Sequence, residues 1–434
     1  MNDAKLVKVW KGSALPPKWI EKRRALGWES TEELEKYVKS IINEIKKRGD
    51  AALLEFTQKF DHTNLTPENF CVTKEEIEDA YSMVSKKQIS ALEFMKDKIE
   101  NFERQLLKQI DLTIDDDIRV QIIPRPIQSI GCYVPGGEAA YPSTLLMTVT
   151  PANVAQVPRI VVCSPPSENG LINPLTVVAA DICEIDEIYK VGGAQAIAAL
   201  AYGTESINPV KKIVGPGNKF VTIAKLLVSR DTAIDMPAGP SEILVLADET
   251  ADPQIVALDM ISQAEHSTES VAGLVTTSKD LTQKVIEELK KLIPKVSRGN
   301  FISEALTKHG FIITYDNIEE AIDFSNKFAP EHLEVITKNP MEVANKISSA
   351  GLILIGPYTP ASASDYCIGT NHVLPTSGFG DVFSGLSVFD FVKRINCIEC
   401  SKKGLFKLRE NIRILAESEG LPNHFLAVDG RFKT

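Results

Sequence analysis

Apolar residues recur with helical spacing through the first quarter of the chain, between faces rich in charge. Two capping-box sequences mark helix starts there, Ser30-Thr31-Glu32-Glu33 and Thr73-Lys74-Glu75-Glu76. The first predicts a helix that runs to Gly49. The second begins a helical stretch that breaks near Ser85 and ends at about Gln109. The pattern therefore predicts an N-terminal helical region.

Short apolar runs replace the helical pattern after this region. Two strand-like runs, 118–123 and 127–134, flank Pro124-Arg125-Pro126, which should separate them. Strands then alternate with helices, an order typical of parallel sheets covered on both faces. The further predicted strands are 159–163, 187–191, 212–215, 242–247, 271–275, 311–314 and 352–355, with helices at 174–183 and 194–201. From Lys402 we expect a charged helix and a tail with little apolar face of its own.

Composition narrows the class of protein. The chain has 434 residues, of which 44% are hydrophobic and 24% charged, so it is globular and longer than one core requires. Its net charge of −10 argues against nucleic acid or an anionic membrane as a partner. No apolar run reaches the roughly 18 residues of a membrane span, and no signal peptide follows Met1. We expect a cytoplasmic protein of two or more domains.

The seven cysteines are scattered, and only Cys397 and Cys400 form a C-x-x-C motif. Such a motif indicates zinc binding or redox chemistry when a second pair or histidines accompany it. Neither accompanies this one, which favours two reduced thiols in a cytosolic chain. We therefore expect any metal site to use other residues.

Histidine is rare in the chain, and most of the six histidines stand near acidic or amide side chains. Asp252-Pro253 predicts the start of a helix that would place Gln263 and His266 on one face near its C-terminal end. Two donors converging there would suit metal or proton chemistry. A histidine in the last turn can equally complement the helix dipole. The other such groups are Glu331-His332, Asn371-His372 and Glu419 with His424.

Three glycine-rich turns, 131–137, 192–195 and 215–218, each follow a predicted strand. Glycine at the carboxyl end of a strand lets the backbone approach a phosphate. None of the turns completes the G-x-G-x-x-G fingerprint, because Phe220 occupies its sixth position after Gly215. Each turn alone favours a tight β-α connection, whereas the three together suggest a dinucleotide or another phosphate-bearing ligand.

Nine motifs in a fixed order resemble the histidinol dehydrogenase family, whose members complete histidine biosynthesis. The resemblance runs from about Ile130 to Arg431, and the first 120 residues match only in general character. The motifs are Tyr-Val-Pro-Gly-Gly (133–137), Gly-Gly-Ala-Gln (192–195), Gly-Pro-Gly-Asn (215–218), Ala-Gly-Pro-Ser-Glu (238–242), Ser-Gln-Ala-Glu-His (262–266), Ala-Pro-Glu-His-Leu-Glu (329–334), Asp-Tyr-x-x-Gly-x-Asn-His-Val-Leu-Pro-Thr (365–376), Ser-Gly-Leu-Ser-Val (384–388) and Glu-Gly-Leu-x-x-His (419–424).

The resemblance implies an NAD-dependent enzyme that oxidises L-histidinol at a zinc site, one zinc ion per subunit. It implies that Gln263, His266 and Asp365 hold the zinc, with His424 supplied by the second subunit of a homodimer. These four residues would also contact the substrate. The remaining substrate contacts would be Ser241, Glu331, His332 and Glu419, and the NAD contacts would be Tyr133, Gln195 and Asn218.

The resemblance also implies an α/β fold with two Rossmann-like parallel-sheet domains, an N-terminal helical region and a small C-terminal dimerisation tail. Residues 1–28 would form an N-terminal arm. Residues 29–132 and 243–386 would form a larger α/β domain that carries most of the zinc site. Residues 133–242 would form a smaller NAD-contacting domain, and 387–434 a tail exchanged between subunits.

Oxidising an alcohol to an acid requires two hydride transfers with a hydration between them. The family assigns the first deprotonation to the position of His332. A carboxylate such as Glu331 can then activate the water that adds to the aldehyde. An adjacent Glu-His could also be a surface pair at the end of a loop, but Ala329-Pro330 precede it where active-site loops are found. For His372 we expect a buried imidazole bonded to the Asp365 loop rather than a ligand.

The sequence departs from the family pattern around Asp365. The departures are Thr359-Pro-Ala-Ser-Ala-Ser364, Thr370 and Gly378-Phe-Gly-Asp-Val382. Two alternative functions follow from the same residues. One is a family relative that oxidises another small alcohol, such as a sulfonated diol, with NAD, although Glu419 and His424 favour histidinol. The other is a zinc hydrolase, which would leave the glycine turns without a role.

Overall fold

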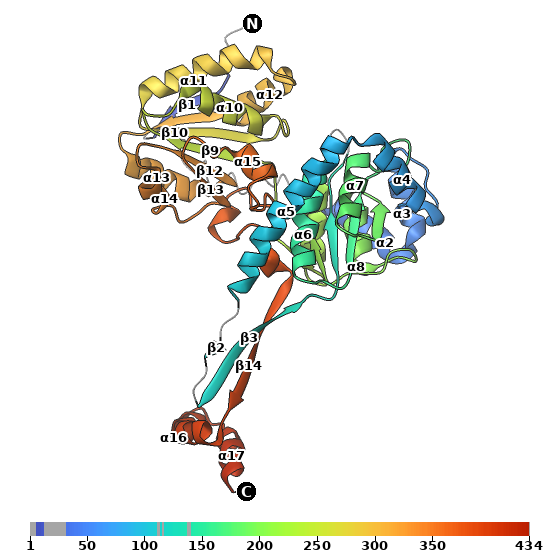
Figure 1. Cartoon of the computed structure of the whole chain (residues 1–434), viewed down its shortest axis with the longest axis vertical. Helices are drawn as coiled ribbons and strands as arrows, with labels where there is room; N and C mark the ends of the chain where they lie inside the picture. Colours follow the sequence, from blue (N-terminus) through green and yellow to red (C-terminus); the bar gives the residue numbers. More distant parts are fainter. Residues whose placement is uncertain (1–5, 13–31, 111–112, 115–116, 137–139, 434) are drawn as a thin grey trace.

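The computed structural model describes residues 6–12, 32–110, 113–114, 117–136 and 140–433. Figure 1 shows two α/β bodies and a slender arm that ends in two helices. The five-stranded parallel sheet has the order β6-β5-β4-β7-β8. Its strands are β4 (Ile130–Tyr133), β5 (Ile160–Ser164), β6 (Glu187–Lys190), β7 (Lys212–Val214) and β8 (Ala233–Ile234).

The six-stranded sheet is parallel as well and has the order β1-β11-β10-β9-β12-β13. Its strands are β1 (Lys8–Lys11), β9 (Glu242–Ala247), β10 (Val271–Thr276), β11 (Phe311–Thr314), β12 (His332–Ile336) and β13 (Leu352–Ile355). The predicted two-sheet α/β fold is therefore confirmed. The edge strand β1 lies within residues 1–28, for which we expected an N-terminal arm.

Two apolar cores cover the two faces of the six-stranded sheet. One contains Val256, Met260 and Val285, and the other contains Phe324 and Phe328. The helices of this body are α10 (Pro253–Ala264), α11 (Lys279–Leu292), α12 (Gly299–His309), α13 (Ile318–Phe328), α14 (Pro340–Ala344) and α15 (Ala361–Tyr366). The predicted N-cap of α10 is present, since the Asp252 side chain accepts a hydrogen bond from Gln254 N.

The five-stranded sheet is also covered on both faces. Four of its helices follow its own strands: α6 (Pro142–Val154), α7 (Pro174–Ile182), α8 (Gly193–Tyr202) and α9 (Lys219–Val228). Four more come from the N-terminal helical region: α2 (Glu32–Arg48), α3 (Asp50–Asp61), α4 (Lys74–Met83) and α5 (Lys86–Lys108). Thr73 forms the predicted capping box at the start of α4. The predicted break near Ser85 is present, and Ser85 forms a further capping box at the start of α5. The box at Ser30-Thr31 lies outside the described residues.

The packing of the N-terminal helices differs from the expected domain grouping. Ile41 and Ile45 of α2 share a core with Val161, and Met95 and Ile99 of α5 share a second core with Leu145 and Leu146. Both cores belong to the five-stranded sheet, whereas we had grouped residues 29–132 with the six-stranded one. The physical reason is that helical periodicity shows which face is buried and does not show which sheet buries it.

A third, antiparallel sheet forms the arm, with the order β14-β3-β2. Its strands are β2 (Thr113–Ile114), β3 (Ile118–Pro126) and β14 (Val392–Cys400). Pro124 and Pro126 pair with Arg394 and Val392, so the Pro-Arg-Pro sequence ends a strand instead of separating two. This is possible because only β14 lies beside that part of β3, and proline is tolerated where the backbone N–H is not needed.

The arm carries α16 (Lys402–Ser418) and α17 (Pro422–Asp429), which pack on one another away from both bodies (Figure 1). Several large apolar side chains of the arm are exposed, among them Ile398 at 67%, Phe406 at 63% and Leu415 at 61%. Cys397 and Cys400 stand three residues apart in β14 and therefore point to opposite faces of the ribbon. This geometry does not suit a shared metal or a disulfide. Among the described residues, no helix is long and apolar enough to cross a membrane.

Glu103 of α5 is fully buried beside the base of the arm. Its Oε2 accepts a hydrogen bond from Val388 N at 2.7 Å, and its Oε1 has no hydrogen-bond partner within the described part of the chain. Burial raises the pKa of Glu103 from its ordinary 4.5 to about 7. The folded state therefore favours the neutral carboxyl. This contribution to stability is complete below pH 4.5 and is lost as the pH rises through 7.

We predict that Glu103→Gln becomes more stable relative to the wild type as the pH rises from 5 to 8, by about 1–3 kcal/mol in the free energy of unfolding. Urea unfolding at several pH values measures this difference. Glu93→Gln, which changes an exposed carboxylate of the same helix, is the control and should follow the wild type. Parallel pH curves for Glu103→Gln and the wild type would contradict the prediction.

Candidate active site

The Glu331-His332 pair lies at the amino-terminal edge of the six-stranded sheet. His332 is the first residue of β12, and Glu242 is the first residue of the adjacent strand β9. Glu242 N donates a hydrogen bond to Glu331 Oε2 at 2.7 Å, and Glu331 N donates to Glu242 Oε2 at 3.4 Å. Glu242 Oε1 accepts a third bond from Ser377 N at 3.1 Å. Glu242 therefore fixes the position of the Glu331 carboxylate.

His332 is buried between carboxylates, with 3% of its surface exposed. Its Nδ1 lies 3.2 Å from Glu242 O and 3.6 Å from Glu331 Oε2, and its Nε2 lies 3.6 Å from Asp365 Oδ1. Burial disfavours the charged imidazole, but the Glu331 and Asp365 carboxylates outweigh it and hold the pKa of His332 well above its ordinary value. Nε2 is buried and makes no hydrogen bond to any described residue, so it is suited to exchange a proton with a ligand.

Asp365 belongs to the short helix α15, and its carboxylate lies 3.6 Å from His332 Nε2. Burial alone would raise its pKa, but the neighbouring His332, His372 and His266 side chains hold the pKa of this carboxyl below its usual value. An ionised carboxylate so close to imidazoles is a suitable cation ligand.

Gln263 and His266 lie at the end of α10, although not in one continuous helix. The helix ends at Ala264, and His266 stands in the following turn, where its N–H donates to Gln263 O at 3.3 Å. Gln263 is buried and His266 is exposed. The described residues contain no cluster of three His, Cys, Asp or Glu side chains arranged to hold a metal. The set implied by the family resemblance has only His266 and Asp365 of these residue types in one chain, because Gln263 would contribute an amide oxygen and His424 would come from a second subunit.

His372 joins the two bodies of the protein. Its Nδ1 is bonded to Asp365 O at 2.9 Å, and its Nε2 lies 3.4 Å from Thr144 Oγ1 on α6. Asn371 Nδ2 donates to Met147 O on the same helix at 2.7 Å. Burial lowers the pKa of His372, so the imidazole is neutral. The predicted structural role of His372 is confirmed.

The predicted cofactor residues lie at the carboxyl edge of the five-stranded sheet. Tyr133 is the last residue of β4, and its hydroxyl accepts a hydrogen bond from Gly193 N at 3.1 Å. Gln195 is 1% exposed, and neither atom of its amide has a partner among the described residues. Asn218 caps α9 by accepting from Phe220 N and Val221 N. Unpaired buried amide atoms indicate a group that is completed by a ligand.

A buried ion pair holds the third glycine turn in place. Lys225 and Asp235 form a salt bridge, with side-chain exposures of 4% and 1%. Lys225 Nζ donates to Gly215 O at 2.8 Å, and Asp235 Oδ2 accepts from Gly215 N at 2.7 Å. Gly215 has φ of +114°, a conformation that disfavours other residues. The turn before Asn218 is therefore rigid.

Two of the predicted substrate residues, Glu419 and His424, lie far from the Glu331-His332 pair. Glu419 is the last-turn cap of α16, His424 is on α17, and both are exposed at the end of the arm (Figure 1). Ser241 directly precedes β9, beside Glu242. One chain therefore assembles Ser241, Glu331, His332 and Asp365 but not Glu419 or His424.

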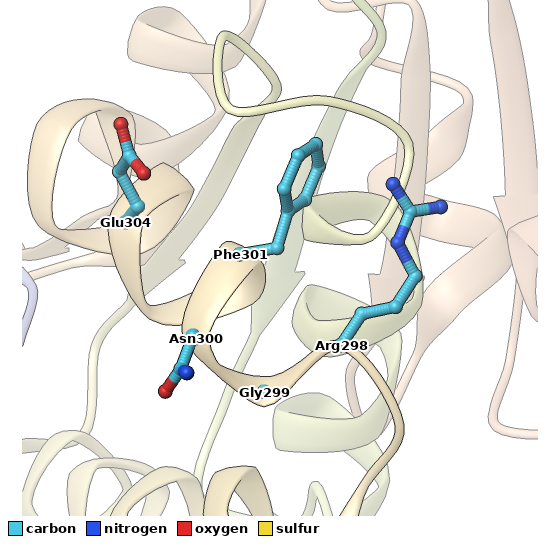
Figure 2. Close-up of a pocket in the computed structure, with 5 residues that line it drawn as sticks. All are labelled: Arg298, Gly299, Asn300, Phe301 and Glu304. Atoms are coloured by element: carbon cyan, nitrogen blue, oxygen red, sulfur yellow. The ribbon is translucent and has the colours of Figure 1, made fainter. Parts of the chain in front are cut away.

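A surface pocket of about 590 Å³ contains none of the candidate residues. Figure 2 shows Arg298, Phe301 and Glu304 around it at the start of α12. Sequence reasoning missed Glu242, Ser377 and Thr144. The available signal for Glu242 was an acidic residue at the start of an otherwise apolar buried strand.

Two parallel sheets, a buried carboxylate–imidazole centre and rigid glycine turns define an α/β enzyme with acid–base chemistry. The family model described as histidinol dehydrogenase matches residues 26–432. Histidinol dehydrogenase of Clostridium acetobutylicum is 47% identical over 423 residues, covering 97% of this chain and 98% of the relative. That of Methanothermobacter thermautotrophicus is 47% identical over 388 residues, covering 89% and 91%.

A solved structure supports the same relationship. The crystal structure of histidinol dehydrogenase from Elizabethkingia anophelis superposes with a TM-score of 0.92 at 38% identity, covering 99% of this chain and 98% of that one. The chain therefore belongs to the histidinol dehydrogenase family and is an oxidoreductase. The match begins at residue 26, which corrects our expectation that the first 120 residues share only general character with the family.

We predict that Glu242→Leu lowers the free energy of unfolding by about 2–6 kcal/mol, because the buried N–H groups of Glu331 and Ser377 each lose an acceptor at about 1–3 kcal/mol. Urea unfolding measures the loss. Glu242→Gln retains one acceptor oxygen, so its free energy of unfolding should lie between those of the wild type and Glu242→Leu. The control is Glu249→Leu, an exposed position beyond the other end of β9, which should change stability little. Wild-type stability in Glu242→Leu would contradict the bracing role of this carboxylate.

Proposed function

We propose that this enzyme oxidises L-histidinol through L-histidinal to L-histidine and reduces two NAD⁺, the last steps of histidine biosynthesis. The observation that carries this proposal is the buried His332 Nε2, which has no hydrogen-bond partner among the described residues and faces Asp365 beside Glu331. Family membership supports the substrate, since the relatives at 42–47% identity bear the name of this activity. The same membership removes the support for a zinc hydrolase.

In this proposal His332 and Glu331 act in succession. The neutral form of His332 would take the hydroxyl proton at Nε2 while the carbinol hydride passes to the first NAD⁺, which gives the aldehyde. Glu331 then takes a proton from water as its oxygen adds to the aldehyde carbon. The aldehyde oxygen would carry the negative charge of the resulting hydrate anion, which would pass its hydride to the second NAD⁺ and give the acid. Tyr133, Gln195 and Asn218 would contact the cofactor at the edge of the five-stranded sheet.

A zinc ion would be held by Gln263, His266 and Asp365, with His424 from a second subunit. The amide oxygen, imidazoles and ionised carboxylate form a donor set that zinc accepts. The ion would supply a Lewis acid that holds the substrate nitrogens. Ser241 and Glu419 would complete the substrate pocket.

The proposed assembly is a homodimer in the cytoplasm. Its support is the arm, which places Glu419 and His424 away from their own chain's centre and leaves Ile398, Phe406 and Leu415 exposed (Figure 1). Exchange of such an arm between identical subunits would bury these side chains and complete two equivalent sites.

We predict that L-histidinol yields two NADH per histidine and that the two half-reactions depend on different residues. His332→Asn should slow alcohol oxidation by about 10²–10⁴-fold, because the base is lost, and slow the oxidation of supplied histidinal less. Glu331→Gln should depress the aldehyde step most. NADH formation from each substrate, measured separately, tests the assignment. Equal losses of both half-reactions in both variants would show that the roles are not divided.

The shared site predicts complementation between two inactive variants. When His424→Ala and His332→Asn subunits exchange, one site of each mixed dimer carries both defects and the other carries neither. An equal mixture should recover roughly a quarter of the wild-type activity. The measurement is NADH formation after verified subunit exchange, with each variant alone as the control. No recovery would mean that His424 does not serve the partner's site.

A further inference from the structure

Glu334 closes the Ala-Pro-Glu-His-Leu-Glu motif and has no role in the proposed chemistry. It lies in β12 two residues after His332, so the two side chains leave the sheet on the same face. The residue is 1% exposed. A buried carboxyl in the middle of a strand requires hydrogen-bond partners, and the groups that act on Glu334 come from two other elements.

The first partner is the start of α15. Glu334 Oε1 accepts a hydrogen bond from Ala361 N at 2.7 Å. Ala361 is the first residue of α15, and the preceding Pro360 supplies no side-chain cap. Glu334 therefore performs the capping task that a serine or aspartate at position 360 would perform. Asp365 is carried by the next turn of the same helix.

The second group is the carboxyl of Asp259 on α10, a helix that contacts α15. Its negative charge, together with burial, raises the pKa of Glu334. Glu334 Oε2 is buried and has no N–H or O–H donor among the described residues unless the Asp259–Glu334 pair itself keeps a proton. Two carboxyl groups form a hydrogen bond only when one of them is protonated. Burial raises the pKa of Asp259 to about 6 and holds that of Glu334 well above its ordinary value, which favours the protonated pair.

Asp259 lies one helical turn before Gln263, on the same face of α10. The carboxyl pair thus connects the strand of His332, the helix that ends in Gln263 and His266, and the helix of Asp365. We propose that Asp259 and Glu334 share one proton and act as positioning residues that hold α10 and α15 at the spacing required by the metal. The inference rests on the proposed zinc site.

Paired substitutions separate the hydrogen bonds from the charge. In Glu334→Gln the amide oxygen can accept from Ala361 N while the amide N–H donates to Asp259, which imitates the protonated pair. Glu334→Leu has a similar volume but leaves Ala361 N without an acceptor. Asp259→Asn and Asp259→Leu test the other member in the same way.

The measurement is zinc affinity, from competition with a chromophoric chelator on the full-length protein. Partners of metal ligands typically contribute about 10–100-fold to affinity, so we expect a loss of this size in Glu334→Leu and Asp259→Leu. Glu334→Gln and Asp259→Asn should bind zinc nearly as the wild type does. NADH binding, followed by fluorescence, should be unchanged in all four variants because the cofactor turns lie on the other sheet. Glu287→Leu, at an exposed position of α11, is the matched control.

The outcomes separate the positioning role of Asp259 and Glu334 from the zinc site on which it rests. Wild-type affinity in the folded leucine variants would overturn the positioning role while leaving the zinc site intact. Equal losses in Glu334→Gln and Glu334→Leu would overturn the shared proton, because the amide retains both hydrogen bonds. Absence of zinc binding by the wild-type dimer would overturn the zinc site itself and the inference with it. Circular dichroism identifies any variant that does not fold, and the Asp259 pair then provides the test.

Discussion

The hydrogen bonds between Glu242 and the backbone around it are the constraint on which the active centre depends. A buried carboxylate is tolerated only when its oxygens are satisfied, and Glu242 accepts from the N–H groups of Glu331 and Ser377. In return its own N–H binds the Glu331 carboxylate, and its carbonyl meets His332 Nδ1. One residue at the start of β9 thereby fixes the acid, the imidazole and the loop that covers them.

The two sheets contribute opposite edges to the function. The acid–base centre lies at the amino edge of the six-stranded sheet, whereas the glycine turns lie at the carboxyl edge of the five-stranded one. The carboxyl edge of the six-stranded sheet has a separate pocket of about 350 Å³, lined by residues such as Asp248, Asp316 and Lys338, without any candidate catalytic residue. Contacts from Thr144 through His372 to Asp365 connect the two edges that are used. This bridge connects the body of the glycine turns with the body of the Glu331-His332 pair.

Local signals in the sequence were sufficient for most elements. The caps at Thr73, Ser85 and Asp252 mark helix starts because a cap is satisfied within a few residues. Partner choice was not predictable in this way. The edge strand β1 pairs with β11, which lies some 300 residues later in the chain. Pro124 continues strand β3 because only β14 lies beside this part of β3, so the opposite edge needs no backbone N–H. The helices before residue 109 were assigned to the wrong sheet for the same reason.

The residues of the candidate site also differ in whether the sequence alone identifies their role. Motifs identified Glu331, His332 and Asp365, and the structure brings these three together. Glu242 and Glu334 stand in the same motifs without a predicted role, because a buried carboxylate shows its purpose only through partners that the fold supplies.

The arm is the part of the fold that one chain leaves incomplete. Two long antiparallel strands and a helix pair extend away from both bodies in the part of the chain that the structure describes (Figure 1), and a two-stranded ribbon is marginal in water. A partner surface would bury its exposed apolar side chains, and in the proposed function Glu419 and His424 would serve the partner's centre. In the proposed dimer a single exchange does both, since folding of the arm and completion of the site would occur in the same contact.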